Sequence, residues 1–135
     1  MFLVTDAPID VTALRAAVTV PEHGAIVVFE GVVRDHDRGR VVRALEYQVH
    51  PGAQEALEHI CASVAAEAPG VRLAAVHRYG PLAIGEVAFA AAVSSAHRER
   101  AFAVCALLVD RVKAELPIWK RQEFDDGSHE WVNFA

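Results

Sequence analysis

Two lysines seven residues apart near the C-terminus, Lys113 and Lys120, are the side chains best placed for chemistry. Lys113 comes late in a strongly apolar helical segment, three residues before Leu116, so we expect it at the edge of the buried face. Burial lowers the pKa of a lysine and makes it usable as an acid, base or nucleophile, whereas a helix C-terminus favours the cation. Spacing alone does not decide the direction in which the pKa of Lys113 shifts. A lysine that only covers the core with its stem and neutralises the helix end is the alternative.

Lys120 follows the helix-ending Pro117 and stands between Trp119 and Arg121. In an extended segment it faces opposite to both neighbours, and a simple exposed strand lysine is the alternative to a functional one. A chain that leaves the helix at Pro117 and turns back brings the two ammonium groups near one site. There each cation lowers the pKa of the other, which makes a lysine pair reactive.

His97 and Arg98 begin the same long helix, at the end where backbone N–H groups lack partners and the helix dipole favours an anion. Arginine adds charge-assisted hydrogen bonds to a phosphate or carboxylate. The alternative is that Ser94 or Ser95 caps the helix and Arg98 pairs with nearby glutamates. Arg34, at the start of a charged segment, is a second candidate anion ligand. The sequence therefore predicts a local anion site.

Composition excludes several other kinds of site. The net charge of -5 argues against nucleic acid, because phosphate-backbone binding relies on an excess of lysine and arginine. The longest apolar stretch, residues 101–109, is too short to span a membrane, and residues 1–4 lack a basic leader, so a cytoplasmic protein is expected. His36 lies between Asp35 and Asp37, but the histidines show no zinc-ligand spacing, so no metal and no cofactor are expected.

Periodicity predicts one compact α+β domain over residues 1–135, with helices packed on a mainly antiparallel sheet and a C-terminal β-hairpin. The expected helices are residues 9–18, 51–68 and 96–116, and the expected strands are 25–33, 41–49, 71–79, 86–94, 118–124 and 129–134. The charged segment 34–40 is expected to be an exposed, mobile loop. In the long helix the expected buried face consists of Phe102, Cys105, Val109, Val112 and Leu116.

Five short segments, in order and in register, resemble the large, catalytic subunit of molybdopterin synthase over residues 24–131. They are residues 31–35, residues 47–52, residues 77–80 with 85–86, residues 95–98, and the stretch from Lys113 to Arg121. The resemblance implies an enzyme that installs two sulfurs on cyclic pyranopterin monophosphate to form the dithiolene of molybdopterin. The sulfur donor would be a small ubiquitin-like subunit whose C-terminal Gly-Gly carries a thiocarboxylate. The large subunit would dimerise within a heterotetramer.

Carried over position by position, the resemblance makes Lys113 and Lys120 catalytic, and Arg34, His97 and Arg98 substrate-binding, with Arg121 beside them. It also implies a basic C-terminal stretch that reaches the neighbouring subunit's site, whereas no arginine follows Arg121 here. One of Arg38, Arg40 and Arg43 is the expected substitute, and weaker substrate binding is the alternative.

Two other functions compete with sulfur transfer. A non-catalytic module would bind a phosphorylated metabolite or a partner's C-terminal carboxylate through Arg34, His97 and Arg98, and its lysines would affect affinity alone. A phosphoesterase ranks last, because the sequence shows neither a metal cluster nor a nucleophile directed at phosphate.

Overall fold

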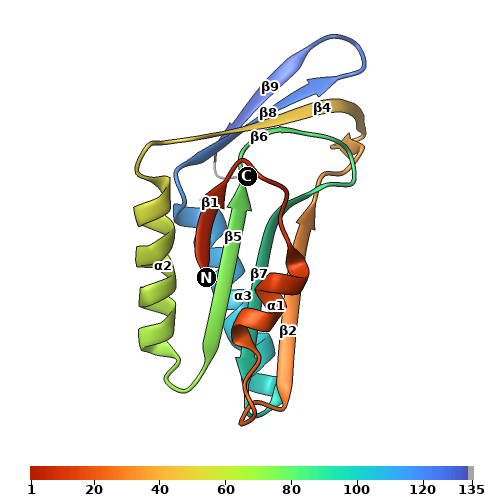
Figure 1. Ribbon diagram of the computed structural model, residues 1–135. Helices are drawn as coiled ribbons and strands as arrows, with labels where there is room; N and C mark the ends of the chain where they lie inside the picture. The colour runs from red at the N-terminus through yellow and green to blue at the C-terminus, as the bar shows by residue number, and fades with distance from the viewer. Residues whose placement is uncertain (134–135) are drawn as a thin grey trace.

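The computed structural model describes residues 1–133, which form three helices and nine strands (Figure 1). In chain order they are β1 (Phe2–Thr5), α1 (Val11–Val18), β2 (Ala25–Val32), β3 (His36–Asp37), β4 (Arg40–Val49), α2 (Ala53–Glu67), β5 (Arg72–Arg78), β6 (Gly80–Leu82), β7 (Val87–Ser95), α3 (Arg98–Glu115), β8 (Ile118–Phe124) and β9 (His129–Asn133). Every helix of the sequence-based prediction is present, which confirms the α+β class. In this described part of the chain, no helix has the length and apolar character needed to cross a membrane.

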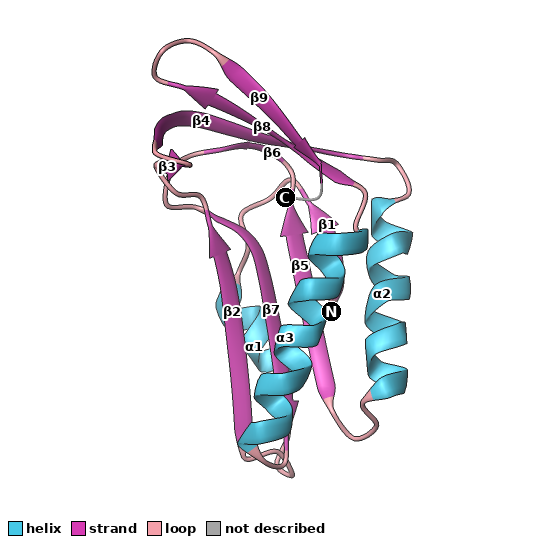
Figure 2. Ribbon diagram, turned by 180° about the vertical axis from the view of Figure 1, so that it is seen from behind, coloured by secondary structure: helices cyan, strands magenta, loops and turns pink. Residues whose placement is uncertain are grey.

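A four-stranded sheet in the order β1-β5-β7-β2 forms the body of the molecule. Its pairs are antiparallel except for β1 and β5, which run parallel. Helices α2 and α3 cover one face and α1 covers the other (Figures 1 and 2). The central strand β7 is buried on both faces and carries three fully buried alanines, Ala90, Ala91 and Ala92, whose small side chains let helices approach from both sides.

A second sheet, in the order β3-β4-β8-β9 with β6 also paired to β4, lies across the end of the first (Figure 2). Strands β8 and β9 form the predicted C-terminal hairpin, with Trp119 opposite Asn133 and Glu123 opposite His129. Phe134, the predicted end of this strand, lies outside the described residues. The pairing of β8 with β4, in which Lys120 lies opposite Tyr47, fixes which β8 side chains face the first sheet.

The charged segment 34–40 differs from the expected mobile loop. His36 and Asp37 form β3, which pairs with Val41 and Arg40, and a two-residue turn connects the strands. Arg38 and Gly39 both have positive φ, at 49° and 78°, which is the backbone of a tight hairpin turn. The prediction that this seven-residue segment is too long and too charged for a tight turn was wrong, because His36, Asp37 and Arg40 extend the sheet.

The buried face of α3 also differs in one residue from the prediction. Phe102 is 61% exposed, whereas its neighbour Ala101 is fully buried. The face that packs on the sheet consists of Ala101, Val104, Cys105, Leu108, Val109 and Val112, so the apolar stripe is centred about one residue away from the predicted one. Phe102 instead lies at the surface between α3 and β2.

Candidate active site

A pocket of about 230 Å³ lies where the two sheets meet, and both lysines line it. Strand β2 and the residues after it provide Gly31 and Arg34, β7 provides Phe89, and β4 provides Tyr47. Lys113 enters from the last turn of α3 and Lys120 from β8. The turn at Pro117 therefore brings the two lysines to one pocket, as their spacing predicts.

The alternation of β8 explains why Lys120 faces the pocket. Ile118, Gln122 and Phe124 are buried, so the side chains of positions 118, 120, 122 and 124 share the face of β8 turned toward the first sheet. Trp119 and Arg121 point to the other face. On that face Lys120 lies between the buried residues Ile118 and Gln122, so it is not an ordinary exposed strand lysine.

Both lysines have a lowered pKa. For Lys113 the main cause is loss of solvent around the ammonium group, and the charge of Arg34 adds to it. The side chain of Lys113 still reaches the surface, so the effect comes from protein atoms around one part of the side chain and not from full burial. For Lys120 desolvation again leads, Lys113 and Arg34 act in the same direction, and the carboxylates of Asp37 and Glu130 oppose them. The pKa of Lys113 is therefore shifted in the direction that burial predicts.

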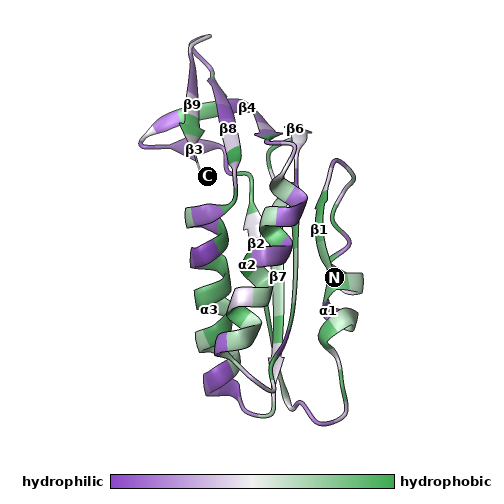
Figure 3. Ribbon diagram, turned by 90° about the vertical axis from the view of Figure 1, so that its left-hand side faces the viewer, coloured by the Kyte–Doolittle hydropathy of each residue, from purple (hydrophilic) through white to green (hydrophobic). Residues whose placement is uncertain are grey.

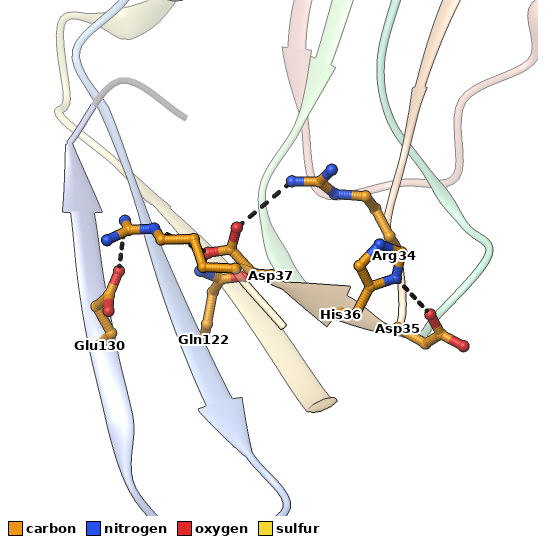
Figure 4. A network of polar contacts seen from close by, with 7 residues as sticks. Arg34, Asp35, His36, Asp37, Gln122 and Glu130 are labelled. Carbon is orange, nitrogen blue, oxygen red and sulfur yellow. Dashed lines mark hydrogen bonds and ion pairs between the residues drawn. The ribbon is translucent and has the colours of Figure 1, made fainter. Parts of the chain in front are cut away.

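Asp37 and Gln122 form a polar bridge beside these cations (Figure 4). The Nε2 of Gln122 donates to Oδ2 of Asp37 at 2.8 Å, and Nη2 of Arg34 lies 3.5 Å from Oδ1 of the same carboxylate. The hydrogen bond from Gln122 is the largest cause that lowers the pKa of Asp37. Sequence reasoning missed both residues, because their meeting depends on the placement of β3 against β8.

A neutral histidine supports the pocket from behind. The ring of His77 stacks on Phe89 with 5.4 Å between centroids and meets the edge of Tyr47 at 5.0 Å. Its Nδ1 donates to the carbonyl of Arg78 at 2.8 Å. Burial lowers the pKa of His77 to about 4, with a contribution from the charge of Lys113, and raises the pKa of Tyr47 to about 12.

His97 and Arg98 lie at the opposite end of α3 from Lys113 (Figure 3 shows hydrophilic residues at both ends of this helix). Lys113 lies 15 positions after Arg98, which corresponds to about 22 Å along the helix axis. His97 and Arg98 line a separate surface hollow together with Gly24 and Ala25. One copy of the chain therefore does not unite the predicted anion ligands with the lysines.

Neither serine supplies the alternative helix cap. His97 is the N-cap residue of α3 and makes no side-chain capping hydrogen bond. Ser94 is fully buried in β7, and its hydroxyl donates to the carbonyl of Val18 at 2.6 Å and lies 2.7 Å from Nδ1 of His23. Ser95 is also a buried strand residue.

The remaining arginines of the prediction lie outside the pocket lining. Arg121 occupies the outer face of β8, where its guanidinium lies 4.0 Å from the carboxylate of Glu123. Arg38 pairs with Glu130 at 3.2 Å, Arg40 with Asp126 at 3.5 Å, and Arg43 with Glu123. Arg34 is thus the predicted arginine that shares the pocket with the lysines.

Comparison with known proteins places this chain and its fold in a class that works in molybdenum cofactor biosynthesis. The chain is 41% identical, over 95% of its length, to molybdopterin synthase catalytic subunit 1 of Mycobacterium tuberculosis, of which it covers 87%. The crystal structure of molybdopterin synthase from Staphylococcus aureus matches 98% of this chain and 96% of its own with a TM-score of 0.91 at 34% identity.

A complex of subunits 1 and 2 of molybdopterin-converting factor from Helicobacter pylori has the same fold, with a TM-score of 0.75 over 98% of this chain and 90% of that one; at 20% identity it bears on the fold alone. The family model described as MoaE protein matches residues 4–115. The chain belongs to the MoaE family.

Proposed function

We propose that this protein is the catalytic subunit of a cytoplasmic molybdopterin synthase. In this reaction two thiocarboxylates, each at the C-terminal Gly-Gly of a small ubiquitin-like partner, give one sulfur each to cyclic pyranopterin monophosphate. The C–S bond of each donor breaks, the donor is left as a carboxylate with oxygen from water, and the dithiolene of molybdopterin forms. Belonging to the MoaE family supports the proposal. So does the crystal structure of the Staphylococcus aureus relative.

The proposal rests on the positions of the two lysines of the chain. Of its 13 lysine and arginine residues only Lys113 and Lys120 are lysines, which leaves 11 arginines, and both lysines line the same pocket. Arginine stays protonated in proteins, whereas a lysine with a lowered pKa can exchange a proton at neutral pH. Positive charge alone would be served by arginine, so the lysine pair favours a pocket that needs proton transfer.

In the proposed reaction Arg34 binds the substrate phosphate, and the lysines handle proton transfers and stabilise the negative charge that develops as sulfur attacks. Lys113 lines the pocket and is more exposed than Lys120, so it is the lysine we assign to the carbonyl of the incoming donor tail. Arg121, on the outer face of β8, is proposed to contact the partner and not the pterin.

A second copy of the chain is proposed to supply His97 and Arg98. The edge strand β2 and helix α3 flank an apolar hollow of about 320 Å³, which is lined by the exposed Phe102 and by the buried Val109. This hollow lies between the two ends of α3. Antiparallel packing of two such faces about a twofold axis would set His97 and Arg98 of each copy near the lysine pocket of the other. A homodimer with one small partner per copy gives the heterotetramer.

The test mixes the purified chain with thiocarboxylated small proteins that end in Gly-Gly, adds cyclic pyranopterin monophosphate, and measures the dithiolene product. We expect Lys113→Ala and Lys120→Ala each to reduce turnover roughly 10²-fold, the loss typical for acid–base or charge stabilisation. Arg72→Ala, at an exposed position on β5, is the matched control and should keep normal turnover. Near-normal product formation by either lysine variant would remove that lysine from the mechanism. Binding without product, for every such partner from the same cell, would favour the non-catalytic module.

A further inference from the structure

Asp37 is a carboxylate placed within a group of cations. Its side chain is 15% exposed, whereas that of Asp35, two residues earlier, is 76% exposed. Asp35 accepts a hydrogen bond from His36 and points away from the bridge that Asp37 makes with Gln122 (Figure 4). The two aspartates thus have the same charge and nearly the same position in the chain, but it is Asp37 that contacts Gln122 and Arg34, two residues that line the lysine pocket.

The two oxygens of Asp37 contact different elements. Oδ2 accepts from Gln122, which is 3% exposed and lies on the same face of β8 as Lys120. Oδ1 faces Arg34 at 3.5 Å. Gln122 therefore fixes the carboxylate, because a buried amide donor without a partner would cost about 1–3 kcal/mol. The fixed carboxylate in turn offers a partner to Arg34, whose side chain is 65% exposed and has many other conformations available.

We propose that Asp37 is a positioning residue of the lysine pocket: anchored by Gln122, it orients the Arg34 guanidinium at the pocket and keeps a negative charge beside Lys120. The effect of Asp37 on turnover rests on the proposed function. Its effect on Lys120 itself does not, and can be measured without substrate or partner.

Charged groups from three elements and from the segment after β2 act on Lys120. Lys113 of α3 and Arg34 after β2 disfavour its ammonium form, and Asp37 of β3 and Glu130 of β9 favour it. Of the two acids, Asp37 ranks before Glu130 in its effect on the pKa of Lys120. Replacing Asp37 by asparagine removes one negative charge and keeps an oxygen that can accept from Gln122. The pKa of Lys120 should therefore fall in Asp37→Asn.

Because the chain has only two lysines, their ammonium groups can be followed one by one. The protein is labelled with ¹³C at lysine Cε, and the chemical shifts of the two signals are recorded from pH 6 to pH 12. Lys113→Arg removes one signal and so assigns the other to Lys120. We expect the titration midpoint of Lys120 to move to lower pH in Asp37→Asn and to stay at the wild-type value in Asp35→Asn, the matched control.

Asp37→Glu keeps the charge on a longer side chain and should return the midpoint of Lys120 toward the wild-type value. A Lys120 midpoint that is the same in Asp37→Asn and Asp35→Asn would overturn the proposal. If Asp37→Asn fails to fold, judged by circular dichroism, the comparison of Asp37→Glu with Glu130→Gln decides: only the second should lower the midpoint, and equal lowering in both would overturn the proposal.

Substrate binding tests the contact with Arg34. In the synthase assay we expect Asp37→Asn to raise KM about 2- to 5-fold, the range for one exposed ion pair, and Asp35→Asn to leave KM unchanged. An unchanged KM in Asp37→Asn would refute the proposal that Asp37 orients the guanidinium of Arg34. If wild-type protein gives no product at all, the proposed function fails, while the lysine titration still decides the role of Asp37.

Discussion

The buried imidazole of His77 predicts a defined loss of stability in mild acid. His77 is 5% exposed, and burial lowers its pKa from the ordinary 6.5 to about 4. In the unfolded chain the imidazole takes up a proton near pH 6.5, but in the folded chain it does so only near pH 4. Between these values the unfolded state binds more protons, so the free energy of unfolding falls as the pH decreases.

The size of this loss follows from the two pKa values. Above pH 6.5 both states hold neutral His77, and the residue makes no contribution to pH dependence. At pH 5.0 the free energy of unfolding is about 2 kcal/mol lower than at pH 7.5, and below pH 4 the full loss is about 3 kcal/mol. Two kcal/mol is a large part of the stability of a domain of this size.

Urea unfolding, followed by the fluorescence of Trp119 and Trp131 at a fixed protein concentration, measures this loss at pH 7.5 and pH 5.0. His77→Phe keeps a ring against Phe89 and removes the titrating group, so it should lose about 2 kcal/mol less than wild type between the two pH values. His59→Gln, on the exposed side of α2, should behave as wild type does. Equal losses in wild type and His77→Phe would refute this account of His77.

Three further predictions concern packing and a side-chain hydrogen bond. Leu108→Ala, at a fully buried position of α3, should lower the free energy of unfolding by about 2–5 kcal/mol, whereas Phe102→Ala should cost less than about 1 kcal/mol in the monomer and should weaken self-association measured by sedimentation. Gln54 accepts from the amide of Val4 at 2.8 Å and donates to the carbonyl of Phe2 at 2.8 Å, so Gln54→Ala should cost about 1–3 kcal/mol and speed hydrogen exchange at Val4.

Long segments with a clear period were predictable from the sequence, and short ones were not. The helix predicted at residues 51–68 is present as α2, because five apolar residues from Ala53 to Val64 recur at helical spacing and form its buried face. Strands β1 and β6 have four and three residues, and their pairing depends on distant partners that local pattern does not specify. The hairpin at β3 was missed because Arg38 has the positive φ usually taken by asparagine or glycine.

The part of the site that is formed by α3 and the turn after it was predictable from the sequence. Lys113 and Lys120 line one pocket because Pro117 ends α3 and the chain turns back, as the sequence indicates, whereas the pairing of β8 with β4 is known from the structure alone. The separation of Arg98 from Lys113 also follows from the predicted helix, since 15 residues of α-helix already span about 22 Å. Asp37 was not predictable, because its role depends on a contact between a hairpin and a strand 85 positions later.

The neutrality of His77 bears directly on how the pocket holds charge. Arg34, Lys113 and Lys120 face the opening, and each added cation makes the others harder to keep protonated. A protonated His77 directly behind Phe89 would add a fourth positive charge that no bound anion can reach. Because burial keeps His77 neutral near pH 7, the positive potential of the pocket comes from Arg34, Lys113 and Lys120, which line it. An anion that binds in the pocket is therefore close to every group that produces this potential.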